Sequence, residues 1–272
     1  MDAVFDREDS VTPPGGVEVV FRQVGAGETM LVLHGGSGSW RHWARNLKAL
    51  SQSFTLVLPD LPGFGDSGDV PRRMAMADYL ALVGEAVQMR LPGDHPFHLV
   101  GFSFGGMIGA GLAAGLGARI QKFTLLAPGG FGKMTGPKLD LRKPAPGMSE
   151  PQVRAVYRHN VEELMLADRE AIEEEAVTNY RENLERARFR NRHLSSSYAT
   201  PPWLAAIRAP MQLLYGEKDV AARPTVQARI EKCLEAKPDI RPHVIPGAGH
   251  WVQWERADEV NRLLLEFHGN GT

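Results

Sequence analysis

The sequence predicts an α/β protein with a mostly parallel, doubly wound sheet. Several short apolar runs are nearly continuous, as in strands that are buried on both faces of a parallel sheet. Between most of these runs lie segments with helical periodicity, and such alternation of strand and helix is typical of this architecture. The 272 residues are enough for one large α/β domain or two small ones.

Composition and charge exclude several classes of protein. The formal net charge of −1 gives no strong field that would attract nucleic acid or an acidic membrane, so we expect neither as a partner. The only cysteine, Cys233, cannot form a disulfide within one chain, which favours a reducing compartment. The acidic first residues lack the apolar core of a secretory signal, and no apolar run approaches the ~18 residues that span a bilayer. We therefore expect a soluble, cytoplasmic protein, and the oligomeric state stays open, a homodimer included.

The expected elements follow each other along the chain. Strands are expected at 17–21, 30–34, 54–59, 97–101, 123–127, 211–216 and 242–247. Helices are expected at 39–50, at 76–90, from Ser103 onward, and at about 257–267, where Val260, Leu263, Leu264 and Phe267 share one face.

One region lacks this alternation. From about Phe131 to Ile207 the sequence contains no convincing strand, and it carries two charged helical patterns at about 149–166 and 168–190. An all-helical insertion between two sheet strands is typical of a lid. We expect a core domain of residues 1–130 and 208–272, and we call residues 131–207 the cap segment.

The stretch from Gly101 to Gly105 reads GFSFG and places Ser103 where a strand ends and a helix begins. It fits the Gly-x-Ser-x-Gly turn, in which glycines two residues before and after the serine leave room for the neighbouring chain. The serine hydroxyl then projects at the carboxyl end of the sheet, near the N-terminal dipole of the helix. Alone, the serine could equally be a helix cap.

A serine is a poor nucleophile until a base takes its proton. In this architecture the chain order is nucleophile, acid, histidine. Asp219 follows the strand at 211–216, and His250 lies in a glycine-bounded loop after the strand at 242–247. We expect Ser103 to attack, His250 to act as general base and then acid, and Asp219 to fix the imidazole tautomer.

The negative charge that develops during attack requires backbone N–H donors. Phe104 follows the nucleophile directly, and Gly36 lies in the glycine-rich loop after the strand at 30–34, so their N–H groups are the candidates for an oxyanion hole. His34, at the start of that loop, is expected to be structural. No phosphate-loop pattern and no cluster of metal ligands is present, so we expect neither a cofactor nor a metal.

The chain resembles the α/β-hydrolase-fold enzymes along nearly all its length, through HGGSGSW, LPDLPGFGDSG, GFSFGG, YGEKD and GAGHWVQWERADEVNRLLLEF. The HWVQWE end is most similar to the meta-cleavage-product hydrolases, which cut a carbon–carbon bond in keto-acids from aromatic degradation. That resemblance implies that Trp251 lines the substrate pocket. The expected apolar pocket also contains Phe102, Phe104 and Met107, with Trp40 as a further candidate.

Two positions depart from that family. Phe102 precedes the nucleophile, where the family usually has asparagine, and Tyr180, with Arg181 beside it, stands where the family has a carboxylate-binding arginine. Both departures favour hydrolysis of a small carboxylic ester over carbon–carbon cleavage. The sequence therefore favours a serine esterase. The alternatives are a carbon–carbon bond hydrolase and a non-catalytic protein that binds a small molecule on this fold.

Overall fold

The computed structural model describes residues 5–133, 135–169 and 172–269. It contains one eight-stranded sheet in the order β1-β2-β4-β3-β5-β6-β7-β8. The six strands from β4 to β8 in that order pair in parallel, and β1 and β2 are antiparallel to their neighbours. The strands are β1 (Arg7–Val11), β2 (Val19–Val24), β3 (Glu28–Leu33), β4 (Phe54–Pro59), β5 (Phe97–Phe102), β6 (Ile120–Leu126), β7 (Met211–Gly216) and β8 (Arg241–Ile245). The expected fold class is confirmed.

The first strand was not among those expected. β1 reads REDSV, is mostly exposed, and lies at the edge of the sheet, where it pairs only with β2. An edge strand needs no apolar face, because its stability comes from the ladder to its neighbour, so hydrophobic periodicity does not reveal it.

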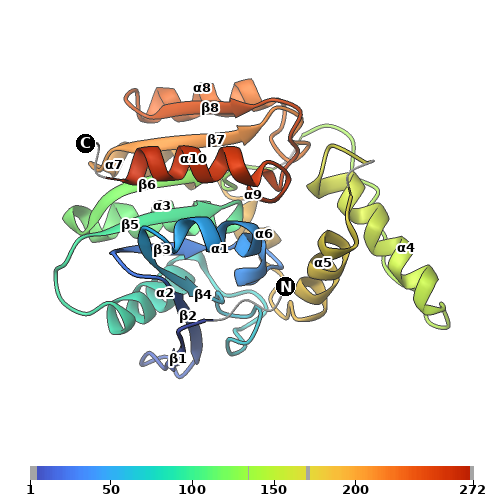
Figure 1. Ribbon diagram of the computed structural model, residues 1–272, viewed down its shortest axis with the longest axis horizontal. Coiled ribbons are helices and arrows are strands. Elements are labelled where there is room, and N and C mark those ends of the chain that lie inside the picture. The colour runs from blue at the N-terminus through green and yellow to red at the C-terminus, as the bar shows by residue number, and fades with distance from the viewer. Residues whose placement is uncertain (1–4, 134, 170–171, 270–272) are drawn as a thin grey trace.

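Helices cover both faces of the sheet (Figure 1). Helix α1 packs against α9 and α10, and α3 packs against α2 and against α7 (Thr200–Ala206). The helix expected at 76–90 is present with these bounds, and the one expected at 39–50 divides into a short 3-10 turn and α1. These elements are η1 (Trp40–Trp43), α1 (Ala44–Leu50), α2 (Met76–Arg90), α3 (Phe104–Leu116), η2 (Gly117–Arg119), α8 (Val226–Ala236), α9 (Val252–Glu255) and α10 (Ala257–His268). None of the described helices has both the length and the apolar character needed to cross a bilayer.

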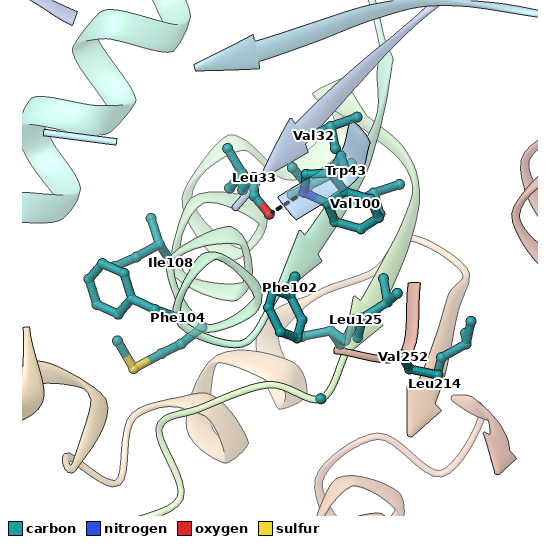
Figure 2. Close-up of a cluster of buried hydrophobic side chains, with 14 of the residues drawn as sticks. Val32, Leu33, Trp43, Val100, Phe102, Phe104, Ile108, Leu125, Leu214 and Val252 are labelled. Carbon is teal, nitrogen blue, oxygen red and sulfur yellow. Dashed lines mark hydrogen bonds between the residues drawn. The ribbon is translucent and has the colours of Figure 1, made fainter. Parts of the chain in front are cut away.

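The residues of β5 and of the start of α3 are buried in the core. Figure 2 shows buried side chains of β3, β5, β6 and β7 beside α3, which carries Phe104 and Ile108. The indole of Trp43 donates a hydrogen bond of 3.2 Å to the carbonyl oxygen of Leu33, at the end of β3. The junction between β5 and α3 is therefore held by packing on every side, which positions whatever side chain it carries.

The cap segment between β6 and β7 carries α4 (Glu150–Asn160), the π-helix η3 (Val161–Met165), α5 (Glu174–Glu185), α6 (Arg192–Ser195) and α7 (Thr200–Ala206). Figure 1 shows α4 and α5 beyond the carboxyl ends of the strands, away from both faces of the sheet. Hydrogen bonds tie this segment to the core, among them Ser39 Oγ to Asn183 Oδ1 at 2.7 Å. In contrast, α7 packs against α3 and α8. The division into two domains stays a prediction.

Candidate active site

Ser103 lies in a strained turn between β5 and α3. Its φ of 52° and ψ of −112° are values that residues with a side chain rarely adopt. The turn is possible because the flanking glycines have no side chain. A Cβ on Gly105 would lie 2.3 Å from the carbonyl oxygen of His34, and one on Gly101 would lie 2.6 Å from the carbonyl oxygen of Gly105. The sequence pattern thus has a direct steric cause.

Three residues that are far apart in the sequence meet at this turn. Asp219 follows β7 and His250 follows β8. His250 Nε2 lies 3.1 Å from Ser103 Oγ, and His250 Nδ1 lies 3.0 Å from each carboxylate oxygen of Asp219. The backbone N–H of Ala221 also donates to Asp219 Oδ1 at 2.8 Å, which orients the carboxylate.

This geometry fixes the histidine tautomer. Because the Asp219 carboxylate can only accept, the proton of a neutral His250 ring resides on Nδ1, and Nε2 is left to accept from the Ser103 hydroxyl. Both Asp219 and His250 are buried, at 6% and 7% exposure, so water does not compete strongly for these hydrogen bonds. The arrangement can move a proton from Ser103 to His250 as the serine attacks an electrophile.

Gly36 and Phe104 face the same cavity as Ser103. Phe104 is the first residue of α3, so its N–H has no partner within the helix. No hydrogen bond joins either N–H to another residue in the described part of the chain. The two groups are thus available to an oxygen that carries negative charge. His34 begins the glycine-rich loop that carries Gly36. Its Nε2 accepts from the N–H of Leu61 at 2.8 Å, in agreement with a structural role.

His42 lies below the glycine-rich loop at residues 34–39, which we call the oxyanion loop because it carries the candidate donor Gly36. Its Nδ1 accepts a 3.1 Å hydrogen bond from the N–H of Gly35, so the proton of the neutral ring is on Nε2. Burial, together with the nearby His34 and His250, holds the pKa of His42 well below its ordinary value of 6.5. The ring therefore stays neutral and keeps its acceptor for Gly35.

The cavity beside Ser103 has a volume of about 170 Å³. The walls are partly polar and partly apolar. The polar side chains are those of Ser37, His42, Asn191 and Ser195, and the apolar ones are those of Phe102, Phe104, Leu164 and Met165. Among the described lining residues there is no arginine or lysine.

Of the residues expected to form the substrate pocket, Phe102 and Phe104 line this cavity. Trp251 is turned into the protein: its indole N–H donates to the carbonyl oxygen of His42 at 2.9 Å, and its ring stacks on Trp254 at 4.4 Å. A buried indole requires an acceptor, and this one lies in the core, so Trp251 does not line the cavity and its role in binding substrate stays a prediction.

Four other residues expected to bind substrate do not line this cavity either. Met107 is fully buried on α3, and Trp40 packs edge-on against Phe5. Tyr180 is buried beside Tyr157. Arg181 pairs with Glu150 and Glu185 on the outer side of α5, so its charge is already neutralised away from the cavity.

Several lining residues could not be found from the sequence. Leu164 and Met165 belong to the π-helix η3. Asn191 directly precedes α6, and Ser195 is the last residue of α6. No motif or periodicity marks these positions. Ser37 could have been found, because it follows Gly36 directly in the oxyanion loop.

Comparison with known proteins defines the class. The protein-family model described as "Alpha/beta hydrolase family" matches residues 30–263, and the chain belongs to this family of hydrolases. It is similar to the 2-hydroxy-6-oxo-6-phenylhexa-2,4-dienoate hydrolase of Burkholderia cepacia, with 31% identity over 268 residues that cover 91% of this chain and 90% of the relative. A 2-hydroxy-6-oxononadienedioate/2-hydroxy-6-oxononatrienedioate hydrolase of Comamonas testosteroni is also 31% identical, with the same coverage.

Solved structures agree on the fold. The chain superimposes on a meta-cleavage product hydrolase with a TM-score of 0.72 and 21% identity, over 97% of this chain and 98% of that one. It superimposes on the carboxylesterase CesB from Bacillus subtilis with a TM-score of 0.77 and 19% identity, over 98% and 92% of the two chains. The resemblance to meta-cleavage-product hydrolases and related esterases is confirmed.

Proposed function

We propose that this chain is a serine hydrolase that cleaves small carboxylic esters through an acyl-enzyme. The observation that carries the proposal is the continuous hydrogen-bonded relay from Asp219 through His250 to Ser103, which opens into a small cavity with two unpaired backbone N–H groups. A binding protein without catalysis would have no need of the strained turn at Ser103, which costs folding free energy.

The reaction follows from the atoms in place. Ser103 Oγ forms a bond to the ester carbonyl carbon while His250 Nε2 takes the hydroxyl proton, and the carbonyl electrons move onto the oxygen. The N–H groups of Gly36 and Phe104 donate to that oxyanion. His250 then gives the proton to the departing alkoxide, which leaves as the alcohol. Water, deprotonated by His250, attacks the acyl-enzyme and releases the acid with Ser103 restored.

Size and charge of the cavity support a small, uncharged acyl group. A volume of about 170 Å³ suits a short or compact acyl chain. Phe102, Phe104 and Met165 offer apolar surface to it. A carboxylate on the substrate would gain no ion pair from the described walls, since the cap arginine Arg181 is held by Glu150 and Glu185.

A second candidate is hydrolysis of a carbon–carbon bond in a meta-cleavage product. The curated relatives at 31% identity support it, because their names describe hydrolases of 2-hydroxy-6-oxo dienoates. In this reaction His250 would also assist ketonisation of the dienol. The substrate's carboxylate would have to rely on neutral donors such as Ser37 and Asn191.

The experiment compares two classes of substrate, p-nitrophenyl esters and a ring-fission dienoate, on one enzyme preparation. We expect kcat/KM for p-nitrophenyl acetate and butyrate to exceed that for 2-hydroxy-6-oxo-6-phenylhexa-2,4-dienoate, with Ser103→Ala as the background for both. A higher kcat/KM for the dienoate would replace the ester proposal with carbon–carbon hydrolysis. If neither class of substrate is turned over and Ser103 is not labelled covalently, the remaining function is that of a non-catalytic protein that binds a small molecule.

A further inference from the structure

Asn191 brings a side-chain amide from the cap segment to the oxyanion loop. It immediately precedes α6 and lines the same cavity as Ser103 and His250. A Cβ placed on Gly36 would lie 2.6 Å from Asn191 Nδ2 and 3.0 Å from Asn191 Oδ1. The amide is therefore in direct contact with the residue whose N–H faces the cavity.

The backbone that carries this amide is well anchored. The carbonyl oxygen of Asn191 accepts hydrogen bonds from the N–H groups of Leu194, at 2.9 Å, and Ser195, at 3.0 Å. Just before it, the N–H groups of Arg188 and Phe189 donate to the carbonyl oxygen of Gly63 in the core at 2.9 and 3.0 Å. The buried ring of Phe189 also stacks on Tyr79 at 5.2 Å. The position of the amide is thus set by contacts with the core.

The amide itself is unused within the described part of the chain. The hydrogen bonds of Asn191 there run through its backbone carbonyl, and its half-buried side chain makes none. The side chain is partly exposed and lines the cavity, so its donor Nδ2–H group faces the space in which a substrate would bind. An oxygen atom of a molecule bound there can accept from it.

We propose that Asn191 is a further catalytic residue, whose Nδ2–H group donates to the oxyanion beside the N–H groups of Gly36 and Phe104. This inference rests on the proposed function. An oxygen that gains a full negative charge attracts a fixed donor more strongly than the neutral carbonyl does, so the interaction strengthens in the transition state. Because two donors come from the core and the third from the cap segment, transition-state stabilisation depends on the cap segment being seated.

The test compares Asn191→Ala with Asn191→Asp, since asparagine and aspartate have nearly the same shape and differ in donor capacity and charge. We expect N191A to lower kcat for p-nitrophenyl esters about 10²-fold, with KM changed by less than about threefold. We expect N191D to be slower than N191A, because a carboxylate would repel the oxyanion. If Asn191 only fills space, the order reverses: N191D keeps nearly the wild-type kcat and N191A loses it, which overturns the proposal.

Two controls separate this inference from the proposed function. Arg192→Gln alters the next residue, which is exposed and begins α6, and it should leave kcat unchanged; thermal melts show whether each variant is folded. The rate at which a fluorophosphonate modifies Ser103 supplies a second readout, because its phosphoryl oxygen gains charge at the same place. Slower modification of N191A than of wild type, without ester turnover in either, would retain the role of Asn191 and remove the ester proposal. Equal rates for wild type, N191A and N191D would overturn the role of Asn191 alone.

Discussion

Replacing Gly105 by alanine tests why the turn at Ser103 requires glycine. The new methyl group would lie 2.3 Å from the carbonyl oxygen of His34 and 2.8 Å from the carbonyl carbon and oxygen of Leu33. These are backbone atoms at the end of β3, which cannot rotate aside as a side chain can. Overpacking a core typically costs about 1–3 kcal/mol, and three contacts with a buried strand place this variant at about 3 kcal/mol or more.

The measurement is the thermal midpoint, with hydrolysis of p-nitrophenyl acetate as the functional readout. For a domain of this size 3 kcal/mol corresponds to a fall in Tm of roughly 6–12 °C. Gly115 is the matched control on the same helix, since a Cβ there meets nothing within 4 Å. Gly115→Ala should leave activity unchanged and raise stability by about 0.5 kcal/mol, because alanine loses less entropy in a helix. A Gly105→Ala protein as stable and active as Gly115→Ala would refute the steric account of the turn.

Three further predictions concern the relay, a buried histidine and a bridging carboxylate. Asp219→Asn should lower kcat on the order of 10³–10⁴-fold by removing the acceptor that fixes the His250 tautomer, and a steady-state rate within tenfold of wild type would exclude that role. Burial holds the pKa of His268 well below 6.5, so folding favours its neutral form; its share of stability is intact above pH 6.5 and is lost as pH falls below it, by up to about 1.4 kcal/mol per pH unit. Urea midpoints at about pH 5.5 and 7.5 should therefore differ less in His268→Gln than in wild type, and an unchanged difference would count against this origin. The Glu255 carboxylate accepts from the N–H groups of Gly249 at 2.6 Å and Asp168 at 2.8 Å, which joins the His250 loop to the cap segment. Glu255→Gln should lower kcat by about tenfold with the fold retained, as judged by its melting curve, and a lower Tm with normal kcat would reduce the residue to a purely stabilising one.

Much of the hydrolase core could be predicted because its signals are local. The helix over 76–90 has apolar residues at helical spacing, and the central strands are continuous apolar runs. The turn at Ser103 is marked in the sequence by Gly101 and Gly105, because a side chain at either position would clash with nearby backbone atoms. The chain order of Ser103, Asp219 and His250 is set by sheet topology, so a loop after the right strand identified each position.

The walls of the cavity could not be predicted, because they depend on packing between distant segments. Trp251 directly follows His250, yet its indole turns inward to the carbonyl oxygen of His42. Arg181 has the charge expected of a carboxylate-binding residue, yet two glutamates engage it on the outer surface. Asn191 has no local signature, and its place beside Gly36 depends on contacts that hold Phe189 against the core.

Mass spectrometry of the protein after treatment with a fluorophosphonate tests the central claim most directly, since only a serine with a working base displaces fluoride at a useful rate. We predict one adduct, located on Ser103, and formation of that adduct at least about 10²-fold more slowly in His250→Ala. An unmodified Ser103 in folded wild-type protein, or modification that proceeds equally well without the imidazole of residue 250, would contradict the account.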